Sequence, residues 1–182
     1  MTLRPGRHQA WILVPPATLL LGALTSFGQT YGPDAIAPLF NSATSWSVVA
    51  FVAAFAARRP SRAALLGATS FAMLLVGYCA TSAVRGFPVG LATTTMWIAA
   101  TIIVGPVLGV AAAWFRSAPR GPHDVRLRLA VAPLGGIAMG EAIYGLRVIS
   151  DTTPAGYWWA QLALGAAFAM IAPALRSRRD GA

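Results

Sequence analysis

One acidic residue, Glu141, lies inside an apolar stretch that runs from residue 129 to residue 148 and is long enough to cross a membrane. A charged side chain near the centre of a bilayer costs about 2.5–3.5 kcal/mol on insertion scales, so it is expected to face the interior of a helix bundle. A carboxylate in that position can bind a ligand, act as an acid, or serve only as a buried structural group. Glu141 is therefore the first candidate for a functional site.

Further polar and aromatic residues fall at a similar depth in other apolar stretches, towards the end that we expect to face outward. Tyr144 follows Glu141 by three residues, so it shares a helix face with the acid and could donate its hydroxyl. Arg85 is the better cationic partner, because Arg147 lies out of phase on the same helix. We expect an outward-facing polar pocket for a small molecule, lined by Glu141, Asn41, Tyr78, Tyr144 and Trp46.

Ordinary structural roles compete with that interpretation. Tryptophan and tyrosine are enriched at membrane interfaces as anchors, and Asn41 could serve only as a hydrogen bond between helices. We predict no catalytic residues, no metal site and no cofactor. His8 and His123 lie in polar segments far from Glu141, and Cys79 is the single cysteine. The apolar stretches also contain no second carboxylate, so the sequence does not require an enzyme.

The elements that must position these residues are membrane helices. The chain has 182 residues, 57% hydrophobic and 10% charged, with a mean hydropathy of +0.63, which is far more apolar than a soluble domain. We predict an all-α integral membrane protein, a single transmembrane domain over residues 1–182 that forms a bundle of six transmembrane helices. The predicted helices span residues 11–28, 35–57, 63–84, 91–115, 129–148 and 157–175.

The arginines predict the orientation of this bundle. Twelve of the fourteen arginines fall on one side of the membrane: before the first helix, in the loops that follow the second and fourth helices, and after the sixth. Only Arg85 and Arg147 fall on the other side. This positive-inside bias predicts a multi-pass protein of the plasma membrane with both termini cytoplasmic and an uncleaved first helix. The same placement accounts for the net charge of +9 through contact with the lipid bilayer, so we expect no nucleic-acid binding.

Small residues recur at four-residue spacing on three predicted helices. The sets are Thr18, Gly22 and Ser26; Gly105 and Gly109; and Gly136 and Gly140. Such faces let helix backbones approach closely, either within the bundle or against a membrane protein partner or a second copy of the chain.

Three motifs resemble a known family. They are Asn41-Ser42 with Trp46 and the run from Val48 to Phe51, the run from Gly105 to Ala111 with Trp114 and Arg116, and the run from Gly140 to Tyr144. This combination is similar to an uncharacterised family of small six-helix membrane proteins from high-GC bacteria, a domain of unknown function. The resemblance implies the six-helix form and no activity. In architecture alone the chain also resembles the S components of energy-coupling-factor transporters, which present a small-residue stripe to their coupling partner.

Three functions follow as hypotheses from different classes. The first is a small-solute binding or transport component with its pocket around Glu141. The second is an accessory subunit that docks a partner through its glycine-rich helix faces. The third is a small intramembrane enzyme that acts on a lipid or an isoprenoid with Glu141 as its single acid.

Overall fold

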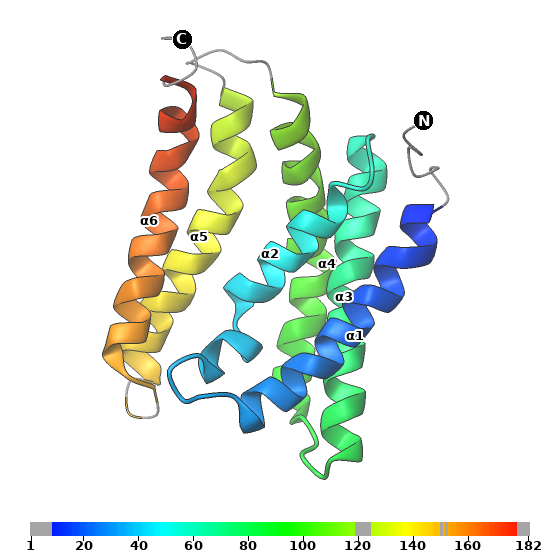
Figure 1. The fold of residues 1–182 in the computed structure, drawn as a ribbon, viewed down its shortest axis with the longest axis vertical. Helices are drawn as coiled ribbons and strands as arrows, with labels where there is room; N and C mark the ends of the chain where they lie inside the picture. Colours follow the sequence, from blue (N-terminus) through cyan, green and yellow to red (C-terminus); the bar gives the residue numbers. More distant parts are fainter. Residues whose placement is uncertain (1–8, 119–124, 150, 152, 178–182) are drawn as a thin grey trace.

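The computed structural model describes residues 9–118, 125–149, 151 and 153–177, and every regular element in these ranges is a helix (Figure 1). The helices are α1 (Gln9–Tyr31), η1 (Ala37–Asn41), α2 (Ala43–Ala54), α3 (Pro60–Val84), α4 (Leu91–Ser117), α5 (Val125–Val148) and α6 (Ala155–Ser177). Within the described ranges, α1, α3, α4 and α5 are long and apolar enough to cross a membrane. The predicted all-helical fold is confirmed to this extent.

The second predicted helix differs from the prediction. Residues 35–57 do not form one continuous helix, because the short 3-10 helix η1 ends at Asn41 and α2 begins only at Ala43. Ser42 between them is extended, with φ −95° and ψ 132°. With 12 residues, α2 is about 18 Å long and falls well short of the ~30 Å hydrocarbon core. The other five predicted helices correspond to α1, α3, α4, α5 and α6.

The bundle has two pairs of long helices with the short helix between them. Figure 1 shows α5 beside α6 on one side and α3 beside α4 on the other, with α1 crossing α3. Helix α2 packs against α3, α4 and α5. The beginnings of α1, α3 and α5 lie at the same end of the molecule as the ends of α2, α4 and α6 (Figure 1). Glu141 of α5 thereby comes to the same level as the beginning of α2.

Glycines allow the closest contacts between helices. A Cβ atom added at Gly22 of α1 or at Gly77 of α3 would overlap backbone atoms of the other helix. The same holds between α3 and α4 at Gly67, Gly105 and Gly109. These positions require glycine because the helix backbones touch there directly.

The three small-residue faces have different fates. Thr18, Gly22 and Ser26 are the buried residues of α1, and they pack inside the bundle against α3. Gly136 and Gly140 of α5 are exposed, and a Cβ atom added at either would meet open space. Of the predicted glycine pairs, Gly105 and Gly109 pack within the chain, whereas the pair on α5 does not.

An aromatic cluster fills the core between α2, α3 and α4. The ring of Trp46 lies 4.6 Å from that of Trp97, 5.6 Å from that of Tyr78 and 6.1 Å from that of Phe71, measured between centroids. All four side chains are buried. The aromatic cluster therefore fixes one face of α2 against α3 and α4.

Candidate functional site

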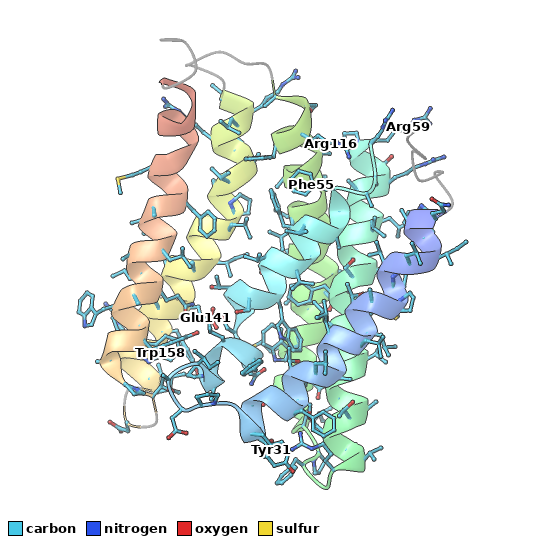
Figure 2. All side chains as sticks on the ribbon, viewed as in Figure 1. Tyr31, Phe55, Arg59, Arg116, Glu141 and Trp158 are labelled. Atoms are coloured by element: carbon cyan, nitrogen blue, oxygen red, sulfur yellow. The ribbon has the colours of Figure 1, made fainter. Side chains whose placement is uncertain are left out.

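The carboxylate of Glu141 lies against the beginning of α2 (Figure 2). Its Oε1 accepts a hydrogen bond from the backbone N–H of Ala43 at 2.8 Å, and its Oε2 accepts one from the N–H of Thr44 at 2.9 Å. The hydroxyls of Ser42 and Thr44 donate to Oε2 at 2.8 and 2.7 Å. The acid of α5 is therefore bound by the first residues of another helix.

Helix α6 completes this shell through Gln161. The Nε2 of Gln161 donates to Glu141 Oε2 at 2.6 Å and lies 3.0 Å from the Thr44 hydroxyl. In total, Glu141 accepts five hydrogen bonds, all from groups that can donate. A shell made of hydrogen-bond donors matches the ionised form of the carboxylate and stabilises its negative charge.

The break before α2 explains why an acid fits there. The first N–H groups of a helix have no carbonyl partner within the helix, and the aligned peptide dipoles add about half a positive charge at that end. Ser42 caps the helix, with its Oγ accepting from the Ser45 N–H at 3.4 Å. Glu141 takes the amides of Ala43 and Thr44 that the cap leaves unpaired.

The other end of α2 meets a charge of opposite sign. The guanidinium of Arg116, from α4, donates to the backbone carbonyls of Phe55 and Ala57 just beyond the last residue of α2 (Figure 2). Cations stabilise helix C-termini for the same reason that anions stabilise N-termini. An acid from α5 and a base from α4 therefore hold the two ends of the short helix.

A cavity of about 470 Å³ adjoins the Glu141 shell. It lies between η1 and α2 on one side and α6 on the other, and residues from both sides line it. Its polar floor consists of the buried residues Ser42, Thr44 and Gln161, and its mouth consists of the exposed residues Ala35, Leu39, Ala160 and Leu164. Ser45, Val48 and Tyr157 complete the lining. Its volume is within the usual range for sites that bind small molecules.

Two polar groups of the lining lack hydrogen bonds. Gln161 is only 6% exposed, and its Oε1 accepts no hydrogen bond from the described residues. The hydroxyl of Tyr157 is buried and lies close to the Ser42 side chain, and it makes no hydrogen bond of good geometry within the described part of the chain. A buried polar group without a partner costs about 1–3 kcal/mol, so each is a position where a bound molecule would gain a hydrogen bond.

Comparison with known proteins places the chain in a family. The model of the family of unknown function DUF6518 matches residues 3–182, which is nearly the whole chain. The chain belongs to this family. No match was found among curated proteins or among solved structures.

The residues nominated from the sequence separate into two groups. Glu141 is at the centre of the site, and Asn41 lies next to Ser42 with its buried Oδ1 unpaired among the described residues. Trp46 and Tyr78 belong to the aromatic cluster, and neither lines the cavity. Tyr144 is 56% exposed and is not part of the lining either.

The prediction that Arg85 pairs with Glu141 is wrong. Arg85 instead donates to the carbonyl and hydroxyl oxygens of Ser26 at 2.5 and 3.0 Å. Its guanidinium also stacks over the rings of Phe27 and Tyr31, at 4.5 and 5.2 Å from their centroids. The end of α1 holds Arg85 away from the acid, and the beginning of α2 takes the place of a cation.

The residues that bind Glu141 were not predicted from the sequence as site residues. Ser42, Thr44 and Gln161 make these contacts, and Tyr157 faces the same cavity. One signal was available, because Gln161 is an amide near the start of an otherwise apolar helix. Nothing in the pattern indicated that it would reach across to α5.

Proposed function

We propose that this protein is a membrane-embedded binding component for a small solute, which it takes into the cavity between α2 and α6. The observation that carries the proposal is an open cavity next to an ordered acid, whose lining includes two polar groups, Gln161 Oε1 and the Tyr157 hydroxyl, that make no hydrogen bond of good geometry to the described residues. A protein that used Glu141 only to hold its helices together would have no need of that combination.

In this proposal Glu141 acts on the solute indirectly. Its carboxylate fixes the positions of Ser42, Thr44 and Gln161, and these residues form the polar floor. Asn41 directly precedes Ser42 at the end of η1, and the contact of Trp46 with Tyr78 holds one face of α2 against α3. Movement of the solute across the membrane would require α2 or α6 to shift, and α2, with only 12 residues, is the more suitable element.

The topology belongs to the proposal as well. We place the chain in the plasma membrane with six membrane-inserted helices, α2 reaching only part of the way across, and both termini in the cytoplasm. Most arginines in the described ranges gather at one end of the bundle, at residues 58, 59, 62, 116, 126 and 128. Arg85 and Arg147 lie towards the other end. The positive-inside rule then puts the floor of the cavity nearer the outer face.

A thermal-shift screen of the purified full chain in detergent tests this function. The probes are vitamins, amino acids, cations and isoprenoids, and each is applied to the parent, to Ala160→Phe and to Ala163→Phe. Ala160 lines the mouth of the cavity, whereas Ala163 is exposed on the same helix but lies outside the lining. The proposal predicts a compound that raises the Tm of the parent and of Ala163→Phe but not of Ala160→Phe. A shift that persists in Ala160→Phe, or the absence of any shift in the parent, would contradict it.

One observation favours a second candidate, an accessory role in which α5 docks against a second copy of the chain. Gly136 and Gly140 form the glycine face that the bundle leaves open. Cross-linking through Gly140→Cys in membranes, with Ala163→Cys as the control, would give a symmetric dimer if this role holds. No observation favours the intramembrane enzyme, because hydrogen bonds from the protein already occupy both oxygens of Glu141.

A further inference from the structure

The mouth and the floor of the cavity have different chemistry. Ala35, Leu39, Ala160 and Leu164 at the mouth are apolar and exposed, and they belong to η1, its preceding loop and α6. Within a bilayer an exposed apolar rim on the perimeter of the bundle borders lipid tails rather than water. Such a rim would give a molecule a sideways route from the lipid into the cavity, with its apolar portion in the mouth and its polar head at the floor.

The floor restricts the kind of head group. The Nε2 of Gln161 is already engaged by Glu141 and by Thr44, so the group left on this side chain is the acceptor Oε1. Only a ligand with an O–H or N–H can satisfy an acceptor. The Tyr157 hydroxyl, which can donate or accept, belongs to a residue of the same lining and makes no hydrogen bond of good geometry to the described residues. The head group must therefore contain a hydrogen-bond donor.

The charge around the cavity further restricts which head groups can bind. None of the cavity's lining residues is basic, and the carboxylate behind the floor carries negative charge within one hydrogen bond of Gln161. An anionic head would lose its hydration and meet repulsion from Glu141, whereas a neutral or cationic head would not.

We infer that the ligand is an amphiphile with a hydrogen-bond-donating head group that is not anionic, such as an alcohol or an amine, and that it enters the cavity from the lipid. This inference rests on the proposed function. It names the class of solute that the cavity selects.

Photo-crosslinking of the full chain in lipid nanodiscs tests the inference. The probes are diazirine-bearing analogues of 1-decanol, decylamine and decanoic acid, applied at pH 7 and mapped by peptide mass spectrometry. The alcohol and the amine are expected to label the segments that line the cavity, and the carboxylate to label them at least threefold less. Ala160→Phe should remove this labelling, and Ala163→Phe should retain it.

A conservative variant tests the hydrogen bond itself. Tyr157→Phe keeps the ring and removes the hydroxyl, so labelling by the alcohol at limiting probe should fall about twofold to tenfold, the range expected for one neutral hydrogen bond. Tyr31→Phe, at an exposed tyrosine of α1, is the matched control and should change nothing. Unchanged labelling in Tyr157→Phe would overturn the assignment of the head group.

The two proposals fail in different ways. If decanoic acid labels the cavity as strongly as the alcohol and Ala160→Phe removes both signals, the inferred head group is wrong and the binding function stands. If all three probes label the parent and Ala160→Phe equally, the cavity does not bind them, and the inference fails together with the binding function.

Discussion

At the scale of single residues, Glu141 shows how a membrane bundle can hold an acid without a basic partner. Two backbone amides, two hydroxyls and one side-chain amide donate to its oxygens. Hydrogen bonds to an ionised acceptor are about twice as strong as neutral ones, and the dipole of α2 adds to them. Together they offset a desolvation cost that an isolated carboxylate could not bear.

Two substitutions at this residue should give a graded loss of stability. Glu141→Ala leaves the amides of Ala43 and Thr44 unpaired, so we expect the free energy of unfolding to fall by about 2–4 kcal/mol. Glu141→Gln keeps the shape but turns an NH₂ group towards these donors, and a loss of about 1–2 kcal/mol is expected. Denaturant titration in mixed micelles measures both values. An alanine variant as stable as the parent would show that the shell contributes nothing to folding.

The sequence pointed to Glu141 but not to its partners, and the reason is physical. Inserting a charged side chain within an apolar membrane stretch costs free energy in any orientation, so its position in the sequence is enough to single it out as a candidate. Serine, threonine and glutamine are inexpensive in membrane helices because they can bond their own backbone. Ser42 and Thr44 each lie nearly one hundred residues before Glu141 in the chain, and only the packing of α2 on α5 brings them to the acid.

At the scale of elements, α2 is the unusual feature. It is a 12-residue helix that begins at the carboxylate of Glu141 and ends beside the guanidinium of Arg116. Both charges come from longer helices that are anchored by their own packing. The bundle thus supplies from outside the terminal hydrogen bonds that a short helix in an apolar environment lacks.

Arg116→Ala should loosen the C-terminal end of this helix. It frees the carbonyls of Phe55 and Ala57, and we expect a loss of about 1–2 kcal/mol together with faster amide exchange in the last turn of α2. Hydrogen exchange followed by mass spectrometry reads the local effect directly. Arg59→Ala, at an exposed arginine on the same end of the molecule, is the control. Equal exchange in the two variants would show that Arg116 does not hold α2.

The break before α2 was only partly foreseeable. Residues 41–47 are polar and residues 48–57 are apolar, so the predicted helix already had two chemistries. Pro38 and Ser42 are residues that suit the start of a helix. The continuous apolar length nevertheless indicated one span, because the acid that makes an interruption favourable lies in another helix.

At the scale of the whole molecule, glycine separates the packed faces from the open one. Gly109 lies against the backbone of Ala63, whereas a Cβ atom added at Gly140 would meet no neighbour among the described residues. A glycine in a helix interior lowers the stability of the folded protein by about 0.5–1 kcal/mol relative to an alanine, where there is room for the alanine methyl group.

The same substitution should therefore have opposite effects at these two sites. Gly140→Ala is expected to raise the free energy of unfolding by about 0.5–1 kcal/mol, and Gly109→Ala to lower it by about 1–3 kcal/mol through overpacking. Thermal unfolding of the two variants in the same detergent gives the comparison. Destabilisation by Gly140→Ala, with loss of a cross-linked dimer, would instead support docking through α5.

The orientation of the bundle can be tested on the whole chain. In a Cys79→Ser background, Asp151→Cys is expected to react with an impermeant maleimide added to intact cells, and Ser61→Cys only after the membrane is opened. Both positions are exposed, and they lie towards opposite ends of the bundle. Labelling of Ser61→Cys in intact cells would reverse the proposed topology.

The overall form was easier to predict than the site because it depends on sums over many residues. The length of an apolar stretch and the distribution of arginines each depend on many residues, so a few local exceptions do not change the prediction. These two features indicated where the helices lie and which of their ends share a side of the membrane. Which helices touch depends on individual contacts, such as that of Gly77 with the Leu19 carbonyl. The cavity results from the gap that such contacts leave between α2 and α6, and no periodicity in the chain encodes it.

Native mass spectrometry of the full chain released from membrane vesicles tests directly whether the cavity beside Glu141 holds a small molecule. We expect a one-to-one adduct on the parent and on Ala163→Phe, absent from Ala160→Phe, with a mass that matches an amphiphilic alcohol or amine. A parent chain that emerges without any adduct, or an adduct retained equally by Ala160→Phe, would contradict this expectation.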